Sequence, residues 1–248
     1  MSEDPRYIYC IVEEREAKRF DFSGIDGSPV HLVNFRDIAA AVGDVKAEMC
    51  EPTRENMLIH TRVLEKLMGE YTVLPVRFGT VCWGEKRVSQ MLEGNYADLK
   101  DELRRLADKI ELGVRILWDK DAVVREIEST GQDLESLREV SLLVSQTEAQ
   151  DMKLKIGELV VSVLASWERR YIKEIYEKLK EISVDSHIDE PIGIKMILNS
   201  SFLVAKEKEK EFDRRVSELG EKYGDKLKFK YIGPVPPYNF VNFEVEWR

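Results

Sequence analysis

The chain has 248 residues and a formal net charge of −9, from 38 Lys and Arg against 47 Asp and Glu. Its length allows one large or two small domains with buried cores, and 43% hydrophobic and 34% charged residues are typical of a soluble globular protein. The negative charge and the lack of a dense basic run argue against nucleic acid as a partner.

Cysteine usage and the N-terminus indicate the compartment. Cys10, Cys50 and Cys82 are an odd number without a C-x-x-C pair, which favours a reducing environment over a disulfide framework. The first residues lack the basic and apolar regions of a signal peptide. The longest apolar run, residues 159–167, is too short to cross a bilayer. We therefore expect a cytoplasmic protein without a membrane span.

The first part of the chain predicts strands followed by a helix. β-Branched and aromatic residues predict strands at 7–12 and 30–35. Residues 38–42 favour a strand or a single turn, although their alanines also suit a helix. A helix is expected to begin after Thr53 as N-cap and to end at Gly69, with His60 on its apolar face.

A hydrophobic stretch at 71–83 contains a single charged residue, Arg77. Pro75 and Gly79 divide it into two short extended pieces. Arg77 must reach water or find an acceptor in such surroundings, because an unpaired buried guanidinium is costly. Helices at 88–93 and 96–109 and a strand at 112–118 are predicted to follow.

The second part is dominated by a long helical pattern. Residues 119–147 are predicted to form a short helix and a linker, and 148–182 a long helix whose apolar stripe includes Trp167. That stripe suits either a core-facing helix or a partner-binding face. A strand at 192–198 and a helix at 206–223 are expected next.

The chain ends with two alternating runs, at 227–231 and 241–247, separated by a proline-rich segment. Proline fixes φ and lacks the N–H that a central strand requires, so the segment is predicted to be a stiff connector between two antiparallel strands. Such a rigid loop loses little entropy on docking and could contact a partner. A plain strand connection is the alternative.

The element order predicts an α+β protein of two domains. From residue 111 onward it approaches a modified ferredoxin-like split βαβ sandwich. We expect an N-terminal α+β domain at 1–109 and a ferredoxin-like domain at 110–248.

The chain shows no strong catalytic or metal-binding constellation. His31, His60 and His187 lie far apart without further ligands at metal spacing, and the dinucleotide, P-loop and nucleophile-elbow motifs are absent. His60 suits a core histidine better than a ligand or a general base. We therefore expect a cofactor-free binding or assembly protein, not an enzyme.

Two motifs carry a resemblance to a known family. Leu74-Pro-Val-Arg-Phe-Gly-Thr80 together with Gly233-Pro-Val-Pro-Pro-Tyr-Asn-Phe-Val241 resembles the gas vesicle protein F/L family, accessory proteins of gas vesicle formation. The early Tyr-Ile-Tyr strand at 7–9, a strand ending in Trp-Asp at 118–119 and residues 196–204 fit the same pattern. One departure is Val235, where family members often carry Trp.

The resemblance implies two α+β domains, the second a modified ferredoxin-like fold, and no enzymatic activity. It implies a protein associated with the gas vesicle that helps to build the shell by contacting the small hydrophobic wall protein and other accessory proteins. The two motifs and the long helix supply our candidate contact residues, although Phe78 and Tyr238 also suit core roles. The candidates are Pro75, Arg77, Phe78, Gly79, Trp167, Gly233, Pro234, Pro236, Pro237, Tyr238 and Phe240.

A different class of function stays open. Arg77 and His60 could hold an anionic ligand near the turn at 75–79, because arginine in an apolar cleft is a good anion anchor. That arrangement would suit a small-molecule enzyme or a sensor.

Overall fold

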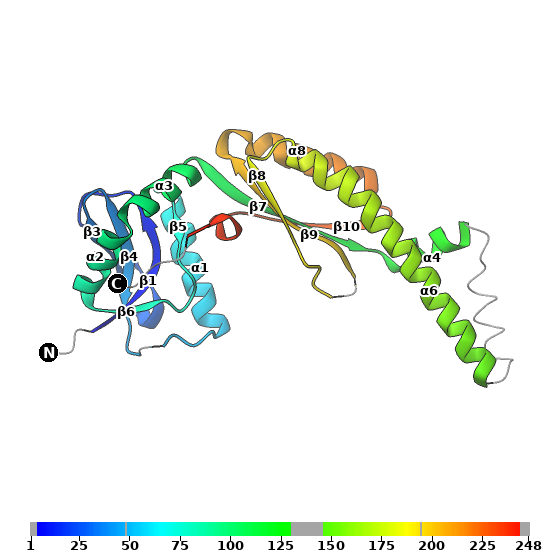
Figure 1. The fold of residues 1–248 in the computed structure, drawn as a ribbon, viewed down its shortest axis with the longest axis horizontal. Helices are drawn as coiled ribbons and strands as arrows, with labels where there is room; N and C mark the ends of the chain where they lie inside the picture. The colour runs from blue at the N-terminus through cyan, green and yellow to red at the C-terminus, as the bar shows by residue number, and fades with distance from the viewer. Residues whose placement is uncertain (1–3, 48, 130–145, 194, 244–248) are drawn as a thin grey trace. The chain divides into compact units, whose positions relative to one another are not determined.

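The computed structural model describes residues 4–47, 49–129, 146–193 and 195–243 (Figure 1). The chain forms two compact units, the first made of Met1–Glu111 with Pro234–Arg248 and the second of Leu112–Gly233. Each unit combines helices with a β-sheet, so the predicted α+β class is confirmed.

The sheet of the first unit has the strand order β2-β3-β4-β1-β5, and β6 also pairs with β1. β1 pairs antiparallel with β4, β5 and β6. The strands are β1 (Pro5–Val12), β2 (Arg19–Ser23), β3 (Pro29–Phe35), β4 (Ile38–Asp44), β5 (Leu74–Pro75) and β6 (Val81–Trp83).

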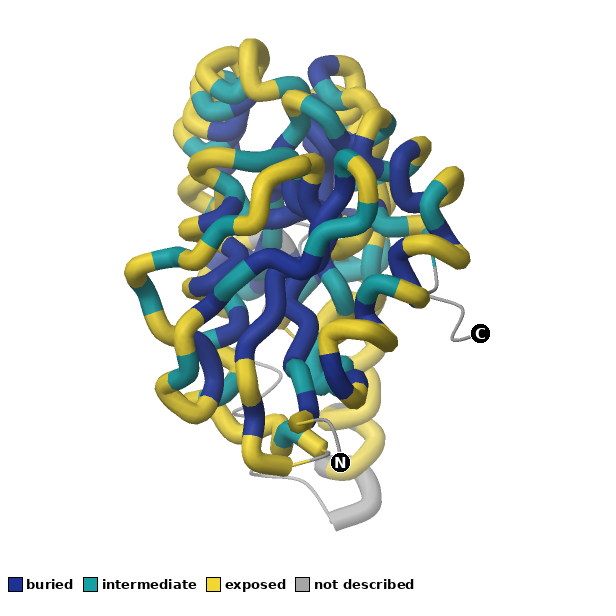
Figure 2. The backbone as a smooth tube through the Cα atoms, turned by 90° about the vertical axis from the view of Figure 1, so that its left-hand side faces the viewer, coloured by how far each residue is buried: buried dark blue, intermediate teal, exposed yellow. Residues whose placement is uncertain are grey.

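Helices cover this sheet because its central strand is apolar on both faces. Successive residues of a strand point to opposite faces, and Tyr7, Ile8 and Tyr9 are all fully buried. Tyr7 and Tyr9 share a core with Leu64 and Leu67 of one helix. Figure 2 shows buried stretches along strands and exposed residues on many of the turns that join them. The helices are α1 (Arg54–Met68), α2 (Gly84–Gly94) and α3 (Tyr96–Leu106).

The predicted strands at 7–12, 30–35 and 38–42 are confirmed, as is the N-cap, since the Asn56 amide donates to Thr53 Oγ1 at 3.2 Å. Gly69 was expected in the left-handed region and is right-handed, with φ −66°. The backbone amides of Gly69 and Glu70 instead donate hydrogen bonds to carbonyls in the last turn of α1. β2 was not predicted, because its exposed positions alternate with only half-buried ones.

The sheet of the second unit has the order β10-β7-β9-β8. α6 and α8 both contact β9, which is buried almost throughout. The elements are β7 (Lys109–Trp118), α4 (Lys120–Ser129), α6 (Gln146–Tyr171), a π-helical turn (Ile172–Tyr176), α7 (Glu177–Lys180), β8 (Asp185–Asp189), β9 (Met196–Ala205), α8 (Glu209–Tyr223) and β10 (Leu227–Val235).

The long predicted helix at 148–182 is present as α6, the π turn and α7 in succession. The strand expected at 192–198 begins only at Met196 and continues to Ala205. Its partner β8 was missed because its residues are mostly polar. Of the linker expected within 119–147, residues 130–145 lie outside the described part of the chain.

The last predicted strand pair is wrong in part. β10 continues through Gly233 and Pro234 to Val235, although proline was expected to end a strand. β10 stands at the edge of its sheet, where a missing N–H costs no ladder bond. Residues 241–243 lie in no strand, and 244–247 lie outside the described residues.

The compact units also differ from the division expected at 1–109 and 110–248, because the residues after Gly233 group with the first unit. Glu111, only 4% exposed, accepts hydrogen bonds from the Asn239 amide at 2.9 Å and from Asn239 Nδ2 at 2.6 Å. The Arg105 guanidinium donates to the Phe240 carbonyl, and the Phe240 ring is buried. These contacts join residues 128 and 135 positions apart, which no local pattern reveals.

Replacing Glu111 with Ala should release the C-terminal segment, since two donors of Asn239 lose a charged acceptor. We expect the first unit to lose about 2 kcal/mol of unfolding free energy in urea titration. Chymotrypsin should also cleave at Tyr238 or Phe240 faster than in the original chain. Glu93→Ala, at an exposed position of α2, is the matched control and should change stability by less than about 0.5 kcal/mol. Equal cleavage rates in the two variants would contradict this anchoring role.

Candidate functional site

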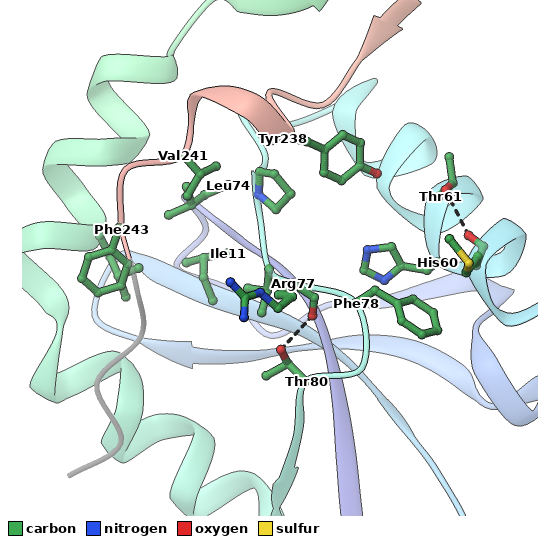
Figure 3. A pocket seen from close by; sticks show the side chains of 14 residues that line it. Ile11, His60, Thr61, Leu74, Arg77, Phe78, Thr80, Tyr238, Val241 and Phe243 are labelled. Carbon is green, nitrogen blue, oxygen red and sulfur yellow. Dashed lines mark hydrogen bonds between the residues drawn. The ribbon is translucent and has the colours of Figure 1, made fainter. Parts of the chain in front are cut away.

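The first unit contains a cavity of about 710 Å³ that we call the Tyr238 cavity (Figure 3). Its walls come from β1, α1, the segment 74–80, α3 and the C-terminal segment 238–243. Most lining side chains are apolar, among them Ile11, Leu74, Phe78, Leu99 and Phe243. A concave, mainly apolar site with a few polar groups is the usual form of a ligand pocket.

Tyr7 holds the wall formed by the segment 76–80. Its hydroxyl bonds to His60 Nδ1 at 2.9 Å and accepts the Gly79 amide at 3.0 Å. Burial raises the pKa of Tyr7, so the phenol is neutral at every physiological pH. Gly79 has φ +86°, a left-handed conformation that favours glycine, and a Cβ at this position would meet the Cys50 carbonyl oxygen at an ordinary contact distance of 3.8 Å. One buried hydroxyl therefore joins β1 to α1 and to this turn.

His60 is neutral and offers one ring nitrogen to the cavity. Its side chain is 5% exposed, and burial lowers its pKa to about 4. Because the Tyr7 oxygen already accepts from Gly79, its hydrogen is best used as a donor to Nδ1, which leaves the imidazole hydrogen on Nε2. Among the described residues, no acceptor lies within hydrogen-bond distance of Nε2. The expectation of a core histidine agrees with this burial, and His60 also lines the cavity.

Aromatic rings flank the imidazole. In Figure 3 the His60 ring lies between those of Tyr238 and Phe78, and Phe78 packs edge-on against it at a centroid distance of 5.6 Å. Tyr238 is 40% exposed, and burial of its hydroxyl end raises its pKa to about 12, opposed by a hydrogen bond with Thr61. Phe78 is half-buried against the core, so it combines a packing role with a place on the cavity wall.

Arg77 follows the first of its two expected outcomes, since it reaches water. Its side chain is exposed, and its carbonyl accepts hydrogen bonds from the Thr80 amide at 3.3 Å and from Thr80 Oγ1 at 2.7 Å. In the described part of the chain, no carboxylate lies within ion-pair distance of its guanidinium. Arg77 is the sole charged side chain among the described lining residues.

The proline-rich segment is less exposed than expected. Pro236, Pro237 and Phe240 are buried, whereas Gly233 and Pro234 are exposed but lie outside the cavity. Its aromatic exit therefore reaches the cavity through Tyr238 alone.

Trp167 is not a surface residue. It is 3% exposed in the second unit, edge-on to Tyr171 at 5.9 Å and beneath Lys226 at 5.7 Å. The core-facing alternative for the long helix is therefore correct at this position, and the expectation of a surface contact at Trp167 is wrong.

The cavity joins residues that sequence reasoning selected with others that it missed. Pro75, Arg77, Phe78 and Tyr238 line it together. The missed lining residues carry no motif and meet only in the folded chain; they are Ile11, Met57, Thr61, Leu74, Val76, Thr80, Leu99, Val241 and Phe243.

Two negative findings concern the described ranges only. Within them, no cluster of three or more His, Cys, Asp and Glu side chains is arranged to bind a metal ion. The helices of those same ranges include none with the length and apolar character needed to span a membrane.

The pKa of His60 predicts a specific pH dependence. A lowered folded-state pKa means that the unfolded chain binds the proton more tightly, so stability is present above about pH 6.5 and is lost as the pH falls towards 4. Between pH 7.5 and 5, we expect His60 to cost roughly 2 kcal/mol of unfolding free energy. Urea titrations of the original chain and of His60→Asn, which keeps an acceptor for Tyr7 without titrating, isolate this contribution. Identical pH profiles for the two proteins would contradict it.

Comparisons with known proteins agree along nearly the whole chain. The family described as "Gas vesicle synthesis protein GvpL/GvpF" matches residues 5–242. The chain is 28% identical to gas vesicle protein F of Dolichospermum flosaquae over 244 residues, covering 97% of this chain and 98% of that protein. Gas vesicle protein L of Haloferax mediterranei is 23% identical, with 88% of this chain and 72% of that protein covered.

Solved structures agree with the fold. The crystal structure of GvpF from Anabaena sp. PCC7120 superposes with a TM-score of 0.78 at 26% identity, covering 97% of each chain. That of GvpF from Microcystis aeruginosa, at 23% identity, shares the fold with a TM-score of 0.72 over 95% of this chain and 98% of that one. The resemblance seen in the two sequence motifs is thereby confirmed, and the chain belongs to the gas vesicle synthesis protein GvpL/GvpF family.

Proposed function

We propose that this protein is an accessory or minor structural protein of gas vesicle assembly, which binds the small hydrophobic wall protein and other accessory proteins. The observation that carries the proposal is the family match over residues 5–242, together with relatives named gas vesicle protein F at similar length. The protein would act in the cytoplasm, associated with the vesicle.

A physical role follows from the surface around the Tyr238 cavity. A wall subunit exposes apolar surface before it polymerises, and such surface aggregates in water. Met57 and Leu58 of α1 are 51% and 45% exposed, and Tyr238 is 40% exposed. These side chains would cover part of the wall subunit, while the net charge of −9 would keep the complex dissolved. Pro75 and Phe78, also of this cavity, are the candidate contacts from the other motif.

We propose that no bond-making step is involved. An assembly role requires only that the surface bind and release its partner, and the family description concerns vesicle synthesis and not turnover of a metabolite. His60, which lines the cavity, bonds to the Tyr7 hydroxyl behind it, and that hydroxyl also accepts the Gly79 amide, which suits a structural role.

We infer that the second unit is a modified ferredoxin-like domain. Its order of strand, helix, two strands, helix and strand supports this, as does the arrangement β10-β7-β9-β8 in the sheet. We also favour the F branch of the family, because the F relative from Dolichospermum flosaquae is covered to 98% and the L relative to 72%.

Binding to the wall protein is tested by co-purification from cells that make gas vesicles. We expect the tagged chain to retain the wall protein and Tyr238→Ala to retain about tenfold less, because aromatic anchors at an interface commonly contribute 1–2 kcal/mol or more. Tyr231→Ala is the matched control, since Tyr231 is 38% exposed, lies on β10 and is not among the residues that line the cavity.

Two results would contradict the proposal. One is the absence of every shell component from the purified protein. The other is normal vesicle formation in cells that lack this protein and any relative able to replace it. Equal losses in the Tyr238→Ala and Tyr231→Ala variants would contradict the cavity as the contact surface and leave the assembly role standing.

A further inference from the structure

We propose that the Tyr238 cavity is a binding site for a small apolar monocarboxylate, such as an arylalkanoic acid, with the carboxylate at Arg77 and the apolar body against the apolar side chains that line the cavity. This inference goes beyond the proposed assembly role and does not depend on it.

The size and lining of the cavity suit a small organic molecule. A volume of about 710 Å³ falls within the range of ligand pockets, and apolar side chains from five segments of the first unit surround it. Small-molecule sites combine such walls with a few polar groups that fix orientation. Here those groups are Arg77, His60, Thr61, Thr80 and Tyr238.

The charge of the site selects an anion. Arg77 supplies one positive charge, and the described lining residues include no carboxylate to neutralise it. His60 is neutral because of its burial, so the site carries a formal charge of +1. Besides burial, the charges of Glu65 and Glu111, outside the lining, help to raise the pKa of Tyr238, which favours a ligand carboxylate at Arg77 over one at Tyr238. More distant charges, beyond about 8 Å, are screened at physiological salt.

The hydrogen bonds of the site leave donors available for the ligand. The Thr61 hydroxyl donates to the Met57 carbonyl, and the Thr80 hydroxyl to the Arg77 carbonyl. His60 Nε2–H and the guanidinium have no such acceptor among the described residues. An acceptor atom of a ligand at His60 would take the hydrogen bond that Nε2–H otherwise makes to water in the cavity.

The arrangement of these groups requires an amphiphile and not a simple inorganic anion. In Figure 3 Arg77 lies beside Ile11 and Thr80, whereas His60, Phe78 and Tyr238 form a separate group on the α1 side. An inorganic anion would occupy only the arginine and leave the apolar walls in water. An aromatic ring packed against Phe78 or Tyr238 on the cavity side would bury those walls in the geometry that aromatic groups prefer.

Calorimetric titration of the full chain with 4-phenylbutyrate tests the proposal, with 4-phenylbutyramide as the uncharged probe. We expect the acid to bind with a dissociation constant on the order of 1 mM or tighter. Arg77→Gln should weaken the acid at least about tenfold and leave the amide unchanged, because a charge-assisted hydrogen bond is lost only with the acid. Arg87→Gln, at an exposed arginine of α2 outside the cavity, should bind the acid as the original chain does.

A second measurement locates the ligand without relying on the charge change. The chain has three histidines, and His60 alone lines the cavity. Saturating acid should shift the imidazole resonances of His60 in the NMR spectrum and leave those of His31 and His187 in place. Val76→Phe, which adds volume at the cavity wall, should weaken acid and amide alike.

The proposal is overturned if the acid does not bind at 10-fold above the expected dissociation constant, if Arg77→Gln and Arg87→Gln weaken it equally, or if binding leaves His60 unshifted. Binding by inorganic phosphate as tight as that of the acid would overturn the amphiphile and indicate a simple anion site.

Discussion

The first unit depends on one buried hydroxyl. Tyr7 stands in the middle of a fully covered strand, and its oxygen bonds to a histidine 53 residues later and to an amide 72 residues later. Each partner satisfies a polar group that burial would otherwise leave without a hydrogen bond. The strand, the helix α1 and the turn at Gly79 are thereby fixed relative to one another, and these elements form three walls of the Tyr238 cavity.

The wall formed by the C-terminal segment is held in place by a different set of contacts. After β10 the chain returns to the first unit, where the buried carboxylate of Glu111 accepts both donors of Asn239 and the Phe240 ring enters the core. Tyr238, which directly precedes Asn239 and Phe240, is left half-exposed beside His60. The two family motifs, separated by more than 150 residues, thus meet at one cavity inside one unit. This meeting gives a physical reason why both motifs occur in one chain.

Sequence patterns predicted those elements whose burial follows a simple period. The strand at Tyr7 and the helix capped by Thr53 were predicted because apolar alternation and a capping side chain act locally. β2 and β8 were missed because edge strands with polar residues lack that alternation. The role of Trp167 stayed open, because a stripe of apolar residues does not reveal what covers it.

The candidate site was predicted only in part, for a related reason. Arg77, Phe78 and Tyr238 stood out through their motifs, whereas Ile11 and Leu99 are ordinary apolar residues until the fold places them at the cavity. The burial of Pro236 and Pro237 and the return of the chain through Glu111 depend on contacts between residues far apart in sequence. No propensity or period describes such contacts.

Amide hydrogen exchange at Gly79 tests the central role of Tyr7 most directly. The Gly79 amide donates to the Tyr7 hydroxyl, whereas the nearby Val76 amide donates to the Tyr9 carbonyl. In Tyr7→Phe, the account predicts that Gly79 exchanges about fivefold to tenfold faster while Val76 keeps its protection, as expected for the loss of one hydrogen bond. Unchanged exchange at Gly79, or an equal acceleration at both amides, would contradict the claim that this hydroxyl holds the turn in place.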